Sequence, residues 1–405
     1  MKNFILIIIA FLCAFRTIAV ESWTIKASMP AARTACAAVA IDSFIYVMGG
    51  VDTMSTGLNT MIAYNVYTDA WTIKAPMATI RNDFFATVVN GKIYAIGGYN
   101  GATGALNIVE EYNPATDTWT TKSPMPTARS LFSGAAVGTK IYVAGGWPGS
   151  FATTECYDVV TNTWSTKTPL PMGKLQLNSG AAMGSKFYLI SGKNYANTEF
   201  YDSCLVYHPS TDAWSYAPNP PFGRFAGSAT YIQSRIYYMG GGQGYFAIPN
   251  FDNNNYLDSA TNTWMTALAC PGKRSYALAV AAKNNKIYLI GGADSAGLPV
   301  RWNHEYTPDL PTPSTRLNED QTAEVSGFTL FPNPCTNHFN IILAGKSSEK
   351  ILVDIYNTNG QLISRQQARN TNGISIDVSG LTVGYYSAIV TNDLGSHYRS
   401  FIVNR

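Results

Sequence analysis

Charge is scarce in this sequence of 405 residues. Asp, Glu, Lys and Arg together make up 13% of the chain, the formal net charge is +3, and no run of Lys or Arg concentrates the positive residues. A nucleic-acid-binding surface needs such a concentration, so we expect no nucleic-acid partner. Hydrophobic residues make up 46% of the chain and aromatic residues 13%, with 34 Gly. This composition favours tightly turned β structure over disorder.

Histidine is rare, and cysteine follows no motif. Of four His, His338 and His397 lie near the C-terminus, while His208 and His304 have no second His near them in the repeat described below. No CxxC, Cys/His cluster, nucleophile motif, Walker motif or dinucleotide motif occurs, so the sequence predicts no metal site, no cofactor and no assignable catalytic residue. Five cysteines follow residue 19 without motif spacing, and we expect them to be mostly buried apolar side chains: Cys36, Cys156, Cys204, Cys270 and Cys335.

Long apolar runs are confined to the N-terminus. Lys2 precedes an apolar stretch at residues 4–13, and the small residues at 17–19 offer a cleavage site after Ala19. This pattern predicts a secretory signal peptide at residues 1–19. No other stretch approaches the length of a membrane span, so we expect an exported chain without a transmembrane segment once the signal is removed. An N-terminal anchor that stays in place is the alternative.

The dominant feature of the sequence is a repeat, seen clearly at residues 92–119. A short apolar strand ends at Gly97 and Gly98, a second strand carries Tyr112, and a turn at Asp117 precedes Trp119. The corresponding Gly pairs begin at Gly49, Gly97, Gly145, Gly240 and Gly291, with Ser191 in place of the first Gly once. The corresponding Trp residues follow one another at 45–50 residues, a period typical of propellers and other repeat arrays: Trp23, Trp71, Trp119, Trp164, Trp214 and Trp264.

Each repeat can be divided into four strands. The first is rich in small residues, which suits an innermost strand beside a central channel, and the second is continuously apolar, which suits burial on both faces. An Asp or Asn turn then joins the third strand to the fourth, whose Trp packs between adjacent sheets. The last repeat has no Trp, whereas Trp23 has no Gly-Gly strand before it. Pairing of residues 22–27 onto the last repeat would therefore seal a ring of six four-stranded blades.

These residues resemble the kelch repeat. The Gly pair after a buried strand, the spaced Tyr and Trp, and an Arg before the first strand match it up to about Pro308, and the fourth repeat departs from it with Lys174 and Ser191. The expected fold is all-β, a six-bladed kelch β-propeller over residues 20–308 that the N-terminal strand closes. A small Ig-like β-sandwich is expected to follow it.

The composition changes after Pro308. A polar, Pro-containing linker is expected at residues 309–326, and alternating strands with turns at Asn359-Gly360 and Asn372-Gly373 predict a small sandwich at residues 327–405. This tail resembles the C-terminal sorting domain of the type IX secretion system of Bacteroidetes. The matching stretches begin at Phe331, Ile355 and Ser379, and the chain ends in Phe-Ile-Val-Asn-Arg. The resemblance implies export across the outer membrane, often with tail removal and attachment to the cell surface; an appended carbohydrate-binding or adhesive sandwich is the alternative.

One face of the ring is the candidate site. A cation opens each inner strand, and the loops after the Gly pairs are expected on the same face, where aromatic rings beside cations would suit an anionic sugar or an acidic peptide. Alternatively, the arginines are structural and bond backbone between blades. A carboxylate pair of Asp83 with Asp294 or Asp52 is also possible at this mouth. The candidate ligand-binding residues are Arg33, Arg81, Arg129, Lys174, Arg224, Arg274, Tyr99, Trp147, Tyr195, Tyr245, Phe246 and Trp302.

Three functions are compatible with these features. The first is a secreted or surface-displayed binding protein, expected as a monomer, that holds a glycan or a protein on this face without catalysis. The second is a carbohydrate-active enzyme, because six-bladed kelch proteins include a sialic acid mutarotase; none of that family's catalytic residues can be placed on this chain. The third is a structural protein of adhesion or matrix. In each case the tail would engage the type IX secretion machinery.

Overall fold

The structure is a computed structural model of the 405-residue chain. It describes residues 21–148, 152–171, 179–194, 199–243, 250–275, 279–283, 285–309, 328–331, 335–343, 348–357, 362–371, 373–392 and 395–403. The predicted signal peptide, nearly all of the linker, the Asn359-Gly360 turn and Asn372 of the second predicted turn lie outside these residues. So do Lys174, Tyr195, Tyr245 and Phe246. The chain forms two compact units, Met1–Pro311 and Thr312–Arg405.

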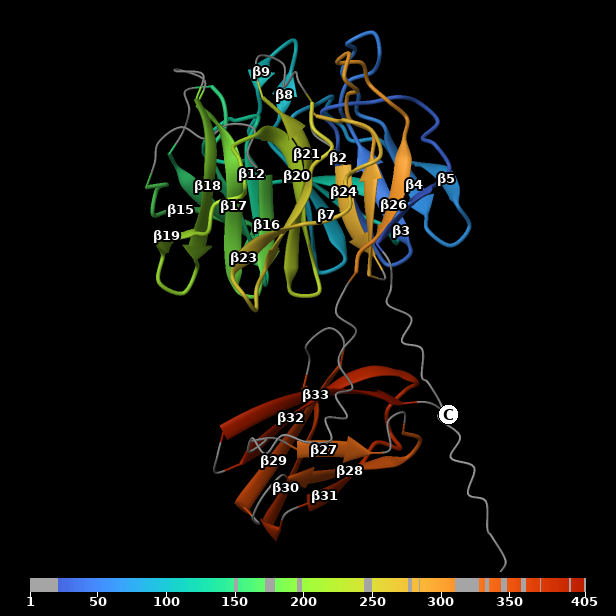
Figure 1. The fold of residues 1–405 in the computed structure, drawn as a ribbon, viewed down its shortest axis with the longest axis vertical. Coiled ribbons are helices and arrows are strands. Elements are labelled where there is room, and N and C mark those ends of the chain that lie inside the picture. Colours follow the sequence, from blue (N-terminus) through green and yellow to red (C-terminus); the bar gives the residue numbers. More distant parts are fainter. Residues whose placement is uncertain are drawn as a thin grey trace, which may run out of the picture. The chain divides into compact units, whose positions relative to one another are not determined.

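The described residues of the first unit form six four-stranded antiparallel sheets (Figure 1). The first contains β2 (Ala37–Ile41), β3 (Phe44–Met48), β4 (Met61–Asn65) and β5 (Ala70–Lys74). The second contains β6 (Phe85–Val89), β7 (Lys92–Ile96), β10 (Val109–Asn113) and β11 (Thr118–Lys122), with a side hairpin of β8 (Tyr99–Asn100) and β9 (Gly104–Ala105). The third contains β12 (Ser133–Val137), β13 (Lys140–Ala144), β14 (Thr154–Asp158) and β15 (Thr163–Lys167).

The other three sheets repeat the same order. The fourth contains β16 (Ser179–Met183), β17 (Lys186–Asn194), β18 (Glu199–His208) and β19 (Ala213–Ala217). The fifth contains β20 (Phe225–Ile232), β21 (Arg235–Gly242), β22 (Asn254–Asp258) and β23 (Thr263–Thr266). The sixth contains β24 (Ala279–Lys283), β25 (Lys286–Ile290), β26 (Asn303–Thr307) and β1 (Ser22–Ile25).

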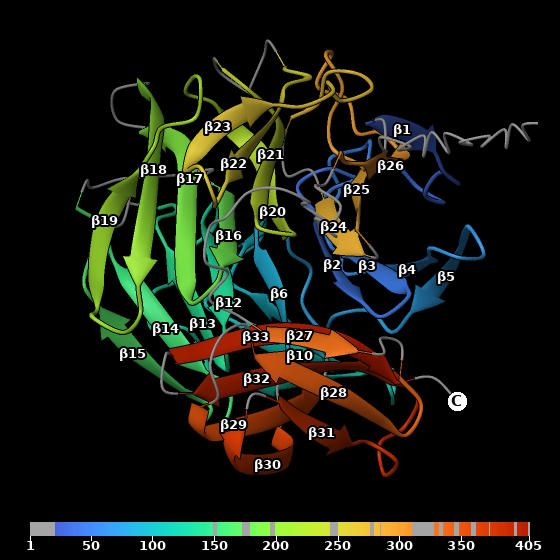
Figure 2. The ribbon, with the colours of Figure 1, turned by 60° about the horizontal axis from the view of Figure 1, so that its bottom comes forward.

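The sheets surround a common centre, as a propeller requires. The first strands β2, β6, β12, β16, β20 and β24 contact one another in this order, and β24 also contacts β2. Strand β1 pairs antiparallel with β26, from Ser22 opposite Thr307 to Ile25 opposite His304, so the N-terminal segment supplies the outer strand of the sixth sheet (Figure 2). The all-β propeller architecture predicted from the repeat is confirmed.

The Tyr, Asp and Trp positions that recur from repeat to repeat have a shared physical role. Asp117 lies in the left-handed region (φ 53°) in the turn between β10 and β11. Its Oδ1 accepts hydrogen bonds from Tyr112 Oη (2.6 Å) and from the backbone N–H of Ala75 (2.9 Å), just after β5 of the first sheet. Trp119 Nε1 donates to the carbonyl of the same Ala75 (2.9 Å). The turn thus holds both backbone groups of one residue in the preceding sheet, and we call this arrangement the inter-sheet clasp.

Three other sheet junctions carry the same clasp. Its Tyr, turn residue, Trp and captured residue are Tyr64, Asp69, Trp71 and Ala27; Tyr157, Asn162, Trp164 and Ser123; and Tyr207, Asp212, Trp214 and Thr168. The repeat therefore contains these residue types because four of the junctions between sheets use them in the same hydrogen bonds.

The last two junctions show how the clasp can vary. At the fifth sheet Leu257 replaces Tyr and has no hydroxyl, and Pro218 stands at the captured position and has no N–H. Only the bond from Trp264 Nε1 to the Pro218 carbonyl remains (2.7 Å). At the sixth sheet Glu21 takes the place of the turn Asp. Its Oε2 accepts from the N–H of Leu268 (2.6 Å), and Trp23 Nε1 donates to the Leu268 carbonyl (3.4 Å).

The contribution of the inter-sheet clasp to the free energy of unfolding can be measured by comparing Asp117→Ala with Asn262→Ala. Both positions have φ 53°, so the backbone cost of Ala cancels, but within the described residues the Asn262 side chain forms no hydrogen bond. We expect Asp117→Ala to lower the free energy of unfolding by about 2 kcal/mol more than Asn262→Ala. The Tyr112 hydroxyl and the Ala75 amide lower the pKa of Asp117 below 3.8. Its contribution should therefore be lost as pH falls below about 4, in urea titrations at several pH values.

If Asp117→Ala and Asn262→Ala lower the free energy of unfolding equally, at neutral pH and at pH 3, the Asp117 bonds have no role in joining the sheets. Tyr112→Phe removes only one of the two donors and should give an intermediate loss.

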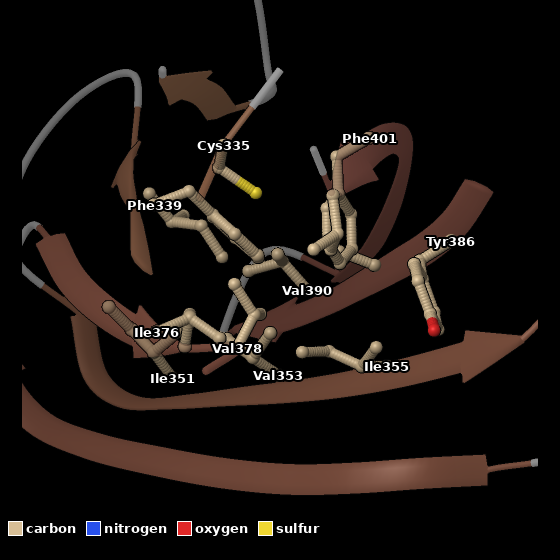
Figure 3. Packing of buried hydrophobic residues seen from close by; sticks show 13 residues of the cluster. Cys335, Phe339, Ile351, Val353, Ile355, Ile376, Val378, Tyr386, Val390 and Phe401 are labelled. Carbon is tan, nitrogen blue, oxygen red and sulfur yellow. The ribbon is translucent and has the colours of Figure 1, made fainter. Parts of the chain in front are cut away.

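The second unit is a sandwich of two antiparallel sheets. Its described strands are β27 (Phe328–Phe331), β28 (His338–Leu343) and β31 (Gly373–Asp377) in one sheet, and β30 (Leu362–Thr371), β29 (Ser348–Asn357), β32 (Gly384–Asn392) and β33 (Gly395–Val403) in the other. Phe339 and Ile376 from the first sheet pack with Val353, Val390 and Phe401 from the second (Figure 3). The predicted small sandwich is confirmed, and the apolar end of the chain lies in β33 at its core.

Candidate functional site

The arginines that open the inner strands are buried. Arg81, Arg129 and Arg274 are 0% exposed, Arg224 is 1% and Arg33 is 3%. Arg129 shows the pattern: its guanidinium donates to the carbonyls of Gly145 (2.9 Å) and Thr153 (3.1 Å) and pairs with Glu155 (2.6 Å). The guanidinium therefore ties the end of the second strand to the start of the third and neutralises a buried carboxylate.

The partner of each arginine varies at one position of the third strand. Arg81 pairs with Glu110, Arg224 donates to Asn255 (3.0 Å), and Arg274 contacts His304, while Arg33 donates only to Gly49 and Thr60. Burial, with Arg274 nearby, lowers the pKa of His304 to about 4. His304 is therefore neutral at pH 7, and its Nδ1 can accept a hydrogen bond from the guanidinium.

Because of these contacts, the five guanidinium groups have almost no exposed surface with which to contact a ligand. They match the structural alternative stated for the arginines, with a difference in detail: the bonds bridge strands mainly within one sheet. The direction of an Arg side chain is not encoded in its position before a strand. A sequence signal existed in Glu110 and Glu155, which occupy the same position of two third strands. A carboxylate buried in such a strand needs a cation as its partner.

A central cavity of about 470 Å³ lies between the inner strands. Its lining has small side chains, hydroxyl groups and a few aromatic rings, and includes Cys36, Phe84, Thr87, Phe132, Ser133, Ser179, Ala182, Ser228 and Tyr231. None of the described residues that line it is charged. The small residues are required by close packing: a Cβ on Gly180 would lie 2.4 Å from the carbonyl oxygen of Gly134 in the neighbouring sheet. The predicted small-residue inner strands thus produce an uncharged cavity.

Three residues at the start of the inner strands form a hydrogen-bonded arc. Ala35, Asp83 and Leu131 have φ 52°, 51° and 54°. The N–H of Asp83 donates to the Ala35 carbonyl (3.0 Å), and the N–H of Leu131 donates to the Asp83 carbonyl (3.0 Å). Each immediately precedes a residue that lines the cavity. We call this end of the cavity the Arg-side mouth.

Asp83 differs from the other two residues of the arc because it carries charge. Its half-buried carboxyl group forms no hydrogen bond or ion pair with any described residue. Burial raises the pKa of this carboxyl group to about 7. The sequence pointed to Asp83 as an acid at the mouth, but only the structure shows that no described residue pairs with its carboxyl group.

Two predicted aromatic residues meet beside this arc. Tyr99 exchanges two backbone hydrogen bonds with Asn82 (3.0 and 2.8 Å), and Trp147 exchanges two with Ser130 (2.8 and 2.7 Å). The Tyr99 and Trp147 rings lie edge to face with centroids 6.0 Å apart. Both side chains are half-buried. The second and third sheets thus bring a carboxyl group and two aromatic rings to one sector of the Arg-side mouth.

The other predicted residues are placed differently. Trp302, 37% exposed, lies over the Arg274 guanidinium (4.8 Å) in the sixth sheet's loop. Asp52 and Asp294 each accept hydrogen bonds from backbone amides of their own loops, and neither bonds to Asp83, so the structure does not assemble the suggested carboxylate pair.

Neither a metal cluster nor a disulfide emerges from the described residues. No three of their His, Cys, Asp or Glu side chains gather as a metal site would need. Cys156 in β14 and Cys204 in β18 are buried thiols within the sheets, and Cys36 and Cys270 are buried thiols in the connections between strands. In Cys36, which lines the cavity, burial raises the pKa of the thiol to about 11.

The fold and the repeat define a kelch-type β-propeller joined to a sorting tail. The sequence model of the Attractin/LZTR1 β-propeller matches residues 10–248, more than half of the chain, so the chain belongs to this family. The model of the secretion system C-terminal sorting domain matches residues 329–404. No curated protein matches the sequence. The solved structure of YjhT is similar, with a TM-score of 0.59 and 17% identity over 69% of this chain and 96% of that one, which supports the fold.

The sorting domain also gives the location of the protein. It indicates export through the type IX secretion system, to the cell surface or the medium, and implies an interaction with that machinery. Within the described part of the chain, no helix has the length and apolar character needed to cross a membrane.

Proposed function

We propose that this protein is an extracellular binding protein that holds a glycan at the Arg-side mouth without catalysing a reaction. The observation that carries the proposal is the Tyr99–Trp147 ring pair, whose backbones bond to Asn82 and Ser130, the neighbours of Asp83 and Leu131. The accompanying domain organisation is a signal peptide at residues 1–19, the propeller at 20–308, a linker at 309–326 and the sorting domain at 327–405.

The chemistry of this sector supports a sugar ligand. Sugars offer C–H faces that pack on aromatic rings and hydroxyl groups that hydrogen-bond to carboxyl oxygens. The two rings come from the loops after Gly98 and Gly146, which differ between repeats, whereas the clasp and the arginines recur as scaffold. Variable loops on a rigid scaffold are where binding residues are concentrated.

The test uses the secreted full chain on a glycan array, followed by calorimetric titration of the best ligand. Tyr99→Ala combined with Trp147→Ala should weaken binding at least tenfold, or about 1.4 kcal/mol, because two apolar contact surfaces are removed. Tyr216→Ala is the matched control, since Tyr216 is 62% exposed on the outer strand β19.

Unchanged affinity of the double variant, with the thermal unfolding of wild type, would rule out this sector as the binding site. An array without any hit, together with a protein captured from surface extracts in a Tyr99- and Trp147-dependent manner, would replace the glycan by a protein ligand.

A further inference from the structure

The charges near the Arg-side mouth are not balanced in the second and third sheets. The described segments that reach this end of the two sheets are residues 75–84, 97–108, 123–132, 145–148 and 152–153, and their only charged residues are Arg81, Asp83 and Arg129. Arg81 and Arg129 are fully buried and pair with Glu110 and Glu155. Asp83 is therefore the one charge of these segments that another residue does not neutralise.

The backbone holds Asp83 in place and leaves its carboxyl group available. Its N–H and its carbonyl are both used in the arc with Ala35 and Leu131. The carboxyl group has no partner among the described residues, and burial raises its pKa to about 7. A desolvated carboxylate without a counter-charge is unfavourable, and a cation that binds beside it restores the lost stabilisation. An anionic ligand would instead meet a like charge.

The adjacent rings are complementary to the same kind of ligand. A cation is attracted to the faces of Trp and Tyr rings, most strongly where water is partly excluded. Tyr99 and Trp147 are half-buried, and their backbones bond to Asn82 and Ser130, the neighbours of Asp83 and Leu131. A carboxyl group and two aromatic rings are thus attached at neighbouring positions of one hydrogen-bonded backbone frame. The uncharged cavity begins one residue further on, at Phe84.

From these observations we infer that the Arg-side mouth binds a glycan that carries a free amino group, with Asp83 as the partner of the ammonium. The inference rests on the proposed function and specifies its ligand class. It also reverses the sign of the ligand charge expected from the sequence, because the five described arginines on which that expectation depended are buried.

Two oligosaccharides with the same backbone test this inference. A chitosan tetrasaccharide has free amino groups, and the chitin tetrasaccharide has the same amino groups acetylated. In calorimetric titrations of the secreted full chain at pH 7 and fixed ionic strength, we expect the chitosan tetrasaccharide to bind at least tenfold more tightly. Asp83→Asn should reduce this preference to threefold or less, because the amide keeps the size of the side chain and removes its charge.

Controls separate charge from folding. Asn, like Asp, tolerates the left-handed backbone of position 83, so Asp83→Asn should unfold at the wild-type temperature. Asp52→Asn changes an acid of another loop on the same face and should keep the full preference for chitosan.

Equal affinities for the two tetrasaccharides in the wild-type protein, or a preference that survives Asp83→Asn, would overturn the ammonium inference and leave glycan binding intact. Failure of both tetrasaccharides to bind would also overturn it, and the glycan array then decides the proposed function separately. An array without a Tyr99- and Trp147-dependent hit would refute both.

Discussion

Replacing Arg129 by Ala is expected to lower the free energy of unfolding of the propeller by about 3–5 kcal/mol. The substitution leaves the buried carboxylate of Glu155 without its cation and removes the donors to the Gly145 and Thr153 carbonyls. A buried ion is costly when its partner is lost, because neither water nor another charge replaces the interaction. Denaturant titration, followed by tryptophan fluorescence, measures the loss.

A matched control and a double variant make this result specific. Lys140→Ala removes a cation 4.0 Å from Asp158, but the Lys140 side chain is 48% exposed, so the loss should stay below about 1 kcal/mol. Arg129→Met combined with Glu155→Leu removes both buried charges and should be more stable than Arg129→Ala. If Arg129→Ala unfolds like wild type and only binding changes, Arg129 is a ligand residue and the structural role is refuted.

The second large effect is expected at Gly97. Its φ is +61°, and a Cβ there would lie 2.7 Å from the Arg129 carbonyl oxygen and 2.8 Å from the Phe132 ring in the next sheet. Gly97→Ala should therefore lower the free energy of unfolding by about 3 kcal/mol or more, as the sum of left-handed strain and steric overlap. Thermal and denaturant unfolding both report the change.

Gly91→Ala separates the two causes. Gly91 has φ +71° at the turn between β6 and β7, and a Cβ there meets no atom within 4 Å. This variant should show the left-handed strain alone, about 1 kcal/mol. Similar losses at Gly91 and Gly97 would mean that the backbone conformation, not the approach of the neighbouring sheet, explains the Gly pairs.

Much of the scaffold could be predicted because its requirements are repeated. The strand before Gly97, the turn at Asp117 and the wedge at Trp119 recur at nearly constant spacing, so the period indicates the architecture. The clasp could not be predicted in full. Its captured residue, Ala75, contributes only backbone atoms, and such atoms leave no signature in the sequence.

The site was harder to predict because its properties depend on side-chain direction and on pairs of residues. An Arg before an inner strand can face solvent or the sheet, and Arg129 faces the sheet because Glu155 and two carbonyls are there. Tyr99 and Trp147 could be selected individually, since they fall outside the scaffold positions. Their contact depends on backbone bonds between segments about 48 residues apart, such as Asp83 and Leu131. That Asp83 has no partner among the described residues also depends on where the folded chain places its neighbours.

The bond between Glu21 and Leu268 has a consequence for the order of events during folding. It joins residues 247 positions apart, and β1 has no edge to pair with until β26 has been made. The first residues of the propeller therefore have no partner strand until nearly the whole unit has been synthesised. Contacts between distant residues slow folding, because the intervening chain must be ordered before they can form. Before the last sheet is complete, this exported chain should therefore be most accessible to chaperones, proteases and the transport machinery.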